Sequence, residues 1–255
     1  MAHYYERTAT GVEPRHYVGM TSRPGELRPT RITDVRKWHK EGRVVVPGVS
    51  EVKDVLAKHA LINWKIDQHL RQAYRNPDLS TDNEDAYLAE IKRITESAME
   101  VAPQAGTDFH ELMQLFFQSK LPESNPFYGL CVKVHQEILH QNGGVAGQYR
   151  VEEYFVGEGF GGTIDLITPC PIICDYKTKQ TAAKFKPGKM AYDDHRMQLA
   201  AYREGVNLPK ARAANIFICL EDGQIDFHIH EEKDLQKGFA LFEHALKIWQ
   251  IQNEV

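Results

Sequence analysis

The run GGTIDLI, residues 161–167, is followed after a short turn by IICDYK, residues 172–177. Both runs are short and apolar, which is typical of consecutive β-strands. Side chains alternate across a strand, so Asp175 and Lys177, two residues apart, point to the same face. Asp165 comes from the strand before. We expect two carboxylates and one ammonium group to meet on this face of a sheet.

The register of the hairpin decides whether the two carboxylates meet. For Asp165 and Asp175 to lie opposite each other, the hairpin must leave an odd number of unpaired residues, such as 168 to 172, or contain a bulge. Such a pair is a site for a hard cation, with Lys177 beside it, as hydrolysis of a phosphodiester requires. The alternative is that each residue is solvated on the open face of an antiparallel hairpin. The unbroken apolar run 172–174 favours a strand buried on both faces, where a charge marks a site or an ion pair.

Three further segments carry candidate functional residues. Upstream, GTDFH at 106–110 predicts a helix start, with Thr107 as the N-cap and His110 in the first turn. Downstream, residues 192–203 predict a helix that carries Gln198 and Tyr202 on one face, because the two are four residues apart. Between these segments lies a strand with two adjacent acidic residues, Glu152 and Glu153. A structural role as the polar edge of an amphipathic helix is the alternative for Gln198 and Tyr202.

Taken in order, these segments resemble a known family. G-T-x-x-H at 106–110, G-x-x-D at 162–165, D-x-K at 175–177 and Q-x-x-x-Y at 198–202 look like the RecB-type branch of the PD-(D/E)xK nuclease superfamily. Within that branch, the segment 192–202 looks most like the mitochondrial genome maintenance exonuclease and its phage and bacterial relatives.

The resemblance implies a role for each matched residue. His110, Asp165 and Asp175 would be metal ligands, and Lys177 would be the catalytic lysine. The auxiliary motif near the lysine and the DNA backbone would be Gln198 and Tyr202. The acidic position of the superfamily name holds Asp175, and the match of Glu152 or Glu153 to a further acidic position stays open.

The chemistry of the residues points to the same cofactor. Mg²⁺ and Mn²⁺ prefer oxygen ligands and take an occasional imidazole. Asp165 and Asp175 would supply those oxygens, and the carbonyl of Tyr176 could add another. Lys177 would orient a water molecule or stabilise the extra charge of the transition state, which for one well-placed donor is worth ~10²–10³ in rate.

The four cysteines do not predict an iron–sulfur cluster, a zinc site or a disulfide framework. Cys131, Cys170, Cys174 and Cys219 are scattered, and no Cys-x-x-Cys motif occurs. Cys170 and Cys174 flank the hairpin strand and are expected to be small buried apolar residues.

Charge is distributed unevenly along the chain, whose net charge is −4. Residues 177–212 contain nine Lys or Arg residues against three acidic ones. A basic zone that begins at the proposed catalytic lysine is the expected footprint for nucleic-acid phosphates. The side chains expected to contact DNA are Lys179, Lys184, Lys186, Arg196, Gln198 and Tyr202.

Composition favours a globular intracellular enzyme. With 255 residues and 42% hydrophobic content, the chain can build one substantial core. No apolar stretch approaches the ~20 residues of a membrane helix. The polar amino-terminal residues do not resemble a signal peptide or a transit sequence, so we expect a cytoplasmic protein.

The pattern along the chain predicts an α/β fold, a restriction-endonuclease-like mixed sheet flanked by helices. Residues 1–46 are expected to form a polar arm with at most short strands, and 47–145 a helical region carrying His110 that walls the active site. A long helix is expected from an N-cap at Ser50, with others at about 83–101, from His110, and at 127–140. The nuclease core is expected at 146–255, with the whole chain as one compact nuclease domain. Within the core we expect strands near 148–156, 160–168, 172–178, 213–220 and 224–230, and helices near 190–205 and 232–252.

The function that we expect from the sequence is a Mg²⁺- or Mn²⁺-dependent deoxyribonuclease. An exonuclease acting on DNA ends or single strands in replication, recombination or repair is favoured, with replication or recombination proteins as partners. Within the same chemistry, the alternative is a structure-specific or sequence-specific endonuclease. From a different class, the alternative is a catalytically silent module that binds DNA ends.

Overall fold

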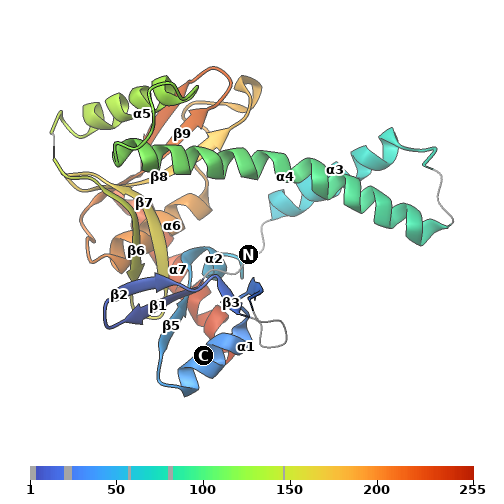
Figure 1. Ribbon diagram of the computed structural model, residues 1–255, viewed down its shortest axis with the longest axis horizontal. Coiled ribbons are helices and arrows are strands. Elements are labelled where there is room, and N and C mark those ends of the chain that lie inside the picture. Colours follow the sequence, from blue (N-terminus) through green and yellow to red (C-terminus); the bar gives the residue numbers. More distant parts are fainter. Residues whose placement is uncertain (1–3, 20–24, 57–58, 80–82, 146) are drawn as a thin grey trace. The chain divides into compact units, whose positions relative to one another are not determined.

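A five-stranded mixed sheet organises the second half of the chain (Figure 1). The computed structural model describes residues 4–19, 25–56, 59–79, 83–145 and 147–255, apart from the side chains of residues 59–61 and 98–108. The strand order is β10-β9-β8-β7-β6. The bounds are Arg150–Val156 for β6, Gly161–Ile167 for β7, Ile172–Lys179 for β8, Arg212–Cys219 for β9 and Ile225–Ile229 for β10.

The two central strands explain why the apolar runs are continuous. Strands β8 and β9 are parallel, and the other neighbouring pairs of this sheet are antiparallel. Parallel strands are covered on both faces, so their sequences are apolar without alternation. The first five residues of β8 and all of β9 after Arg212 are buried accordingly. The expected mixed α/β sheet is confirmed.

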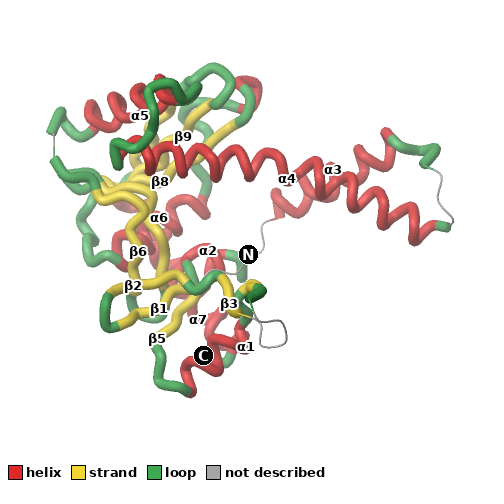
Figure 2. Tube along the Cα trace, viewed as in Figure 1, coloured by secondary structure: helices red, strands yellow, loops and turns green. Residues whose placement is uncertain are grey.

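Helix α6 (Asp193–Gly205) connects the parallel strands β8 and β9, as a crossover between parallel strands requires. It packs against helix α7 (Glu232–Asn253) and contacts β7, β8 and β9. Figure 2 distinguishes these helices in red from the yellow strands of the sheet. Helix α5 (Tyr128–Gln141) precedes the sheet and buries one apolar side. The expected helices at 127–140, 190–205 and 232–252 are therefore confirmed within a few residues.

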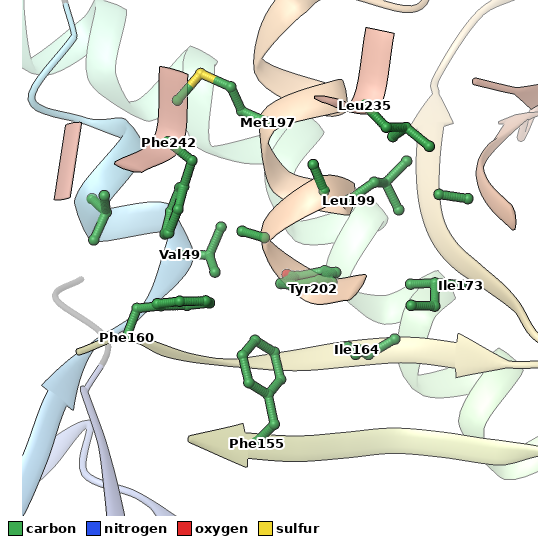
Figure 3. Packing of buried hydrophobic residues seen from close by; sticks show 14 of the residues in the cluster. Val49, Phe155, Phe160, Ile164, Ile173, Met197, Leu199, Tyr202, Leu235 and Phe242 are labelled. Atoms are coloured by element: carbon green, nitrogen blue, oxygen red, sulfur yellow. The ribbon is translucent and has the colours of Figure 1, made fainter. Parts of the chain in front are cut away.

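The main hydrophobic core lies between the sheet and α6 with α7 (Figure 3). Ile164 and Ile173 come from the strands, Leu199 from α6 and Phe242 from α7, and all four are fully buried. Burying one such side chain stabilises the fold by about 1.5–3 kcal/mol. Because the apolar side of α6 is held in this way, the rotation of the helix about its axis is fixed, and so are the directions of its polar side chains.

The amino-terminal segment is more structured than a polar arm. Strands β1 (Tyr4–Thr8), β2 (Gly11–Pro14) and β5 (Val44–Pro47) form a sheet in the order β2-β1-β5, and β3 (Tyr17–Gly19) pairs with β4 (Leu27–Pro29). The short strands were expected.

Helix α1 (Ile32–Lys40) in the same segment was missed by the sequence reasoning. It has few apolar residues, and its buried Val35 joins Tyr4, Val45 and Trp249 in one cluster. Trp249 belongs to α7, close to the other end of the chain. The partner that stabilises α1 is thus distant in sequence, and no local pattern shows it.

Two predicted helix boundaries are wrong. The helix expected from Ser50 is the short α2 (Val49–Lys53), whose N-cap is Gly48, followed by a separate α3 (His59–Arg75). Helices expected at 83–101 and from His110 onward are one continuous α4 (Glu84–Phe117). A glycine destabilises a helix interior by only about 1 kcal/mol, so Gly106, which was taken as a boundary, does not end the helix. The side chain of Thr107, the predicted N-cap, lies outside the described residues.

The described residues divide into two units of packing. One holds those up to Leu56 and from His110 onward, and the other lies within Ala57–Phe109 and contains α3 and most of α4. The predicted functional boundaries near 46 and 145, and the helical wall over the active site, stay predictions.

In the described part of the chain, no helix combines the length and apolar character needed to cross a membrane.

Glu6 in β1 is a buried carboxylate that two arginines neutralise. Its oxygens accept hydrogen bonds from Arg43 Nε at 2.7 Å and Arg15 Nε at 2.6 Å. The hydrogen bond from Arg43, and the contribution of Arg15, lower the pKa of Glu6 to about 2 against the opposing effect of burial. Within the amino-terminal sheet, this cluster ties β1 to the segments around β2 and β5.

Replacing Glu6 by glutamine should lower the free energy of unfolding by about 3 kcal/mol at pH 7. The folded-state pKa lies below the unfolded value, so this stabilisation is fully present above pH ~4.5 and is lost as the pH falls toward 2. Urea denaturation at pH 7 and at pH 3 measures the difference. Glu13→Gln, which removes a more exposed partner of Arg15, is the control and should cost less than about 1 kcal/mol. Equal losses at both pH values would contradict the assignment.

Candidate active site

Strands β7 and β8 bring the two predicted carboxylates together. Their ladder ends at the pair Ile167 and Ile173, which leaves the five residues 168–172 for a turn that a hydrogen bond from Thr168 N–H to the Ile172 carbonyl closes. This is an odd number, as the sequence reasoning required. Two residues further along the same register, Asp165 and Asp175 lie opposite each other and so share a face.

Asp165 sits where the two strands separate. From the turn, the ladder continues only to the pair Leu166 and Cys174. The next amide of β8 that points toward β7 belongs to Tyr176, and it donates to Asp165 Oδ2 at 2.8 Å. A side-chain oxygen thus takes the place of a backbone acceptor. Where the two strands separate, the Tyr176 carbonyl oxygen has His110 Nε2 as its partner, at 3.0 Å.

Asp175 is buried, and three donors surround its carboxylate. Lys177 Nζ lies 2.9 Å from Oδ1 and 2.7 Å from Oδ2. Gln198 Nε2 donates to Oδ1 at 2.9 Å, and Asn215 Nδ2 donates to Oδ2 at 2.7 Å. Both oxygens are therefore hydrogen-bonded, and the rotamer of Asp175 is fixed by groups from β8, α6 and β9.

The predicted helical motif lies inside the protein rather than at a polar edge. Gln198 and Tyr202 are both buried on α6, and Gln198 Nε2 also donates to the Tyr202 hydroxyl at 2.8 Å. The carbonyl oxygen of Gln198 accepts from Lys53 Nζ at 2.8 Å. Lys53, from α2, is itself 6% exposed. The amide of Gln198 is thus oriented from one side by an ammonium and from the other by a carboxylate.

His110 of α4 lies beside the same carboxylates. Its Nε2 is 3.0 Å from the Tyr176 carbonyl oxygen, and its Nδ1 is 3.5 Å from Asp165 Oδ2. The structure thus places His110, Asp165, Asp175, Lys177, Gln198 and Tyr202 in one site, although His110 is not in the first turn of its helix.

Burial and mutual charge set the protonation of this site. Burial raises the pKa of Asp165, and the charge of Asp175 adds to this effect, whereas His110 and, to a smaller extent, Lys177 and the Tyr176 hydrogen bond oppose it. Burial works against ionisation of Asp175 too, but Lys177, with smaller contributions from His110 and Lys53, outweighs it, and the pKa is lowered. Burial works to lower the pKa of Lys177, and the two aspartates raise it. Asp175 and Lys177 therefore form an ion pair, and Asp165, which His110 faces, is the carboxylate whose ionisation burial opposes.

The donor set suits a hard divalent ion. Within the described residues, no group of three or more His, Cys, Asp or Glu side chains forms a ready metal cage. Mg²⁺, however, is commonly held by one or two carboxylates, water and substrate phosphate. His110 Nε2 and the Tyr176 carbonyl oxygen, which form a hydrogen bond of 3.0 Å, could add an imidazole and an oxygen if an ion replaced that hydrogen bond. The residues present fit such an ion.

The predicted basic residues are not equivalent. Lys184, in the short helix η1 (Ala182–Lys184), and Lys186 are exposed, and Lys179 is half-buried on β8. Burial lowers the pKa of Lys179, as do the nearby charges of Lys177 and Lys184. Arg196 instead binds Asp193 and, at 3.1 Å, Asp234 within the protein. The structure thus uses Arg196 in internal ion pairs and leaves the lysines at the surface.

Sequence reasoning missed three polar residues of the site, Lys53, Asn215 and His230. Asn215 interrupts an otherwise apolar strand, and this signal could have marked it. Lys53 and His230 have no comparable local signal, because their partners are 145 and 15 residues away in the sequence.

The two adjacent glutamates differ in their surroundings. Glu153 pairs with Arg150, whereas Glu152 has φ 50° and is half-buried. Burial raises the pKa of Glu152 to about 7, and the charge of Asp165 contributes. Glu152 is the acidic residue nearer to the site.

The expectation for the hairpin cysteines is half right. Cys174 is buried in β8, and Cys170 in the turn is exposed.

No protein-family model matches this chain, and no curated protein matches it. Solved structures that match include the alkaline exonuclease LHK-Exo from Laribacter hongkongensis, with 13% identity and a TM-score of 0.42 over 81% of this chain and 87% of the other. SSO0001 matches with 14% identity and a TM-score of 0.31 over 72% of this chain and 85% of the other. Because the TM-scores are low, these likenesses carry no conclusion about this chain.

Proposed function

We propose that this protein is a Mg²⁺- or Mn²⁺-dependent deoxyribonuclease that hydrolyses phosphodiester bonds. The observation that supports it is the meeting of Asp165 and Asp175 on one sheet face, with Lys177 bound to one carboxylate. A purely structural ion pair needs one carboxylate for one ammonium. The second carboxylate, Asp165, lies 3.5 Å from His110, and burial raises its pKa, so a bound cation would stabilise its ionised form.

The ion would be held by Asp165, Asp175, His110 and the Tyr176 carbonyl. When bound, it would supply Lewis-acid polarisation of a phosphate oxygen and a more acidic water molecule. Gln198 and Asn215 hold the Asp175 carboxylate in one orientation. The hydroxyl of Tyr202 accepts a hydrogen bond from Gln198 and so helps to orient the Gln198 amide.

Lys177 is the residue proposed to act on the reacting atoms. Its ammonium lies on Asp175, at the border of the buried site, and is itself partly exposed. From there it would orient the attacking water or balance the charge that develops on the phosphate in the transition state. The pKa of Lys177 is raised, so the group carries its charge at neutral pH.

Lys179, Lys184 and Lys186 are proposed to bind the phosphates of the DNA backbone, which gives salt-dependent, sequence-independent affinity. Arg196 belongs to this set only if DNA displaces its internal ion pairs. The proposed substrate is DNA with a free end or a single strand, and the proposed activity is exonucleolytic, in replication, recombination or repair together with proteins of those processes.

An assay on end-labelled DNA tests the function. With Mg²⁺ or Mn²⁺, the protein should shorten 5′- or 3′-labelled linear strands progressively and leave closed circular DNA intact. Chelation by EDTA should stop the reaction. Cleavage of the circles would favour an endonuclease of the same chemistry. Tight binding of DNA ends without cleavage of any substrate would contradict an enzyme and favour a silent DNA-end-binding module.

A further inference from the structure

Asn215 is a fully buried amide in the middle of an apolar strand. It lies in β9 beside Asp175 of β8, its partner in the parallel ladder, and its exposed fraction is 0%. Its neighbours in β9 are apolar and buried as well. A buried amide is unfavourable unless its polar atoms are hydrogen-bonded, so the side chain needs partners on both ends.

Both ends of the Asn215 amide have a partner. Nδ2 donates to Asp175 Oδ2 at 2.7 Å, and Oδ1 lies 2.7 Å from His230 Nε2. The ionised carboxylate of Asp175 can only accept, so the amide nitrogen must face it. The amide oxygen then faces His230, which must donate. The orientation of the Asn215 amide is thus determined by the chemistry of its neighbours.

His230 is suited to this role. It follows β10 and is 8% exposed. Burial, with the positive charges nearby, lowers its pKa to about 4, so the ring is neutral at pH 7. A neutral imidazole carries one proton. The contact with Asn215 places that proton on Nε2 and leaves Nδ1 without one.

The hydrogen bonds to the other oxygen of Asp175 are arranged in the same way. Gln198 donates to Asp175 Oδ1 and is oriented by Lys53, as described above. Two buried amides therefore donate hydrogen bonds to the two carboxylate oxygens, one to each, and a further donor fixes each amide. Such double support holds the carboxylate plane, whereas a single hydrogen bond leaves it free to rotate.

We propose that Asn215 and His230 are positioning residues that fix the Asp175 carboxylate for the divalent ion. This role rests on the proposed function for the reaction that it serves. Neither residue touches substrate or ion. They act through Asp175, and such outer partners of metal ligands are typically worth ~10–100-fold in metal affinity or activity.

Mn²⁺ alone, titrated by calorimetry into Asn215→Ala and His230→Ala, measures the effect on the ion. We expect binding ~10–100-fold weaker than in the wild type, and a matching loss of kcat on single-stranded DNA with an unchanged KM. His230→Gln, whose amide N–H can still donate to Asn215, should restore part of both. His244→Ala, at an exposed position of α7, is the matched control and should behave as the wild type.

Nitrogen-15 NMR of the wild-type histidines gives a test that needs no variant and no activity. We expect His230 as the neutral Nε2–H tautomer at pH 7. A proton on Nδ1, or wild-type Mn²⁺ affinity and kcat in both alanine variants, would overturn the positioning role. A wild-type protein that binds Mn²⁺ but cleaves no DNA would instead overturn the proposed function and leave the NMR and Mn²⁺ results to decide on the pair.

Discussion

Asp175→Asn should abolish DNA cleavage in the presence of Mg²⁺ or Mn²⁺, with product formation at the level of a blank. The change removes the charge that Lys177 and the ion both need. It also places a side-chain NH₂ group against Gln198 or Asn215, each of which donates to the native carboxylate. Two donors then face each other in a buried place, where an unmade hydrogen bond costs about 1–3 kcal/mol. Gel assays with end-labelled DNA and calorimetry with Mn²⁺ measure the two losses.

The thermal midpoint of Asp175→Asn is measured alongside, because a buried substitution can lower stability. Asp222→Asn, in the exposed turn before β10, is the control and should retain wild-type cleavage. Full metal-dependent activity in a folded Asp175→Asn protein would place the active site elsewhere.

Lys177→Ala should lower kcat by ~10²–10³ while leaving the fold, Mn²⁺ binding and DNA binding close to those of the wild type. The ammonium stabilises charge that develops only as the phosphorus–oxygen bond breaks, so its loss affects the transition state more than the bound state. Its present contacts are the two oxygens of Asp175, at 2.9 and 2.7 Å. Single-turnover cleavage with saturating protein separates the chemical step from binding.

Lys177→Arg is a sharper variant, because it keeps the charge but replaces a compact ammonium by a planar fork. We expect it to remain well below the wild type. Lys237→Ala, on the exposed side of α7, serves as the control for loss of one surface charge. Lys177→Ala with undiminished activity, in a preparation free of contaminating nuclease, would refute the assigned role.

Local periodicity explains why most of the sheet could be predicted. The strands β7 and β8 are apolar runs bounded by turn residues, and the register follows from the length of the turn between them. Asp165, Asp175 and Lys177 lie within this one hairpin. Their meeting is a short-range consequence of alternation along a strand, so reasoning from the sequence reaches it.

The boundaries of the helices could be predicted less well from the local sequence pattern. Gly106 and Thr107 predict a helix start, yet α4 continues through them to Phe117. A glycine disfavours a helix interior by only about 1 kcal/mol, so by itself it does not end a helix. The helix α1 was missed for the converse reason, because Trp249 from the far end of the chain stabilises it.

What the sequence by itself determined is the α/β class, the strand and helix order of the second half, and the carboxylate hairpin with its lysine. Only the tertiary structure decided the surroundings of Asp175. Lys53, Gln198, Asn215 and His230 come from four separate segments and meet only when α6 packs between the sheet and α7. The physical reason is that alternation and helical period act over a few residues, whereas a buried hydrogen-bond network is selected by the folded core, which excludes water and leaves these groups only one another as partners.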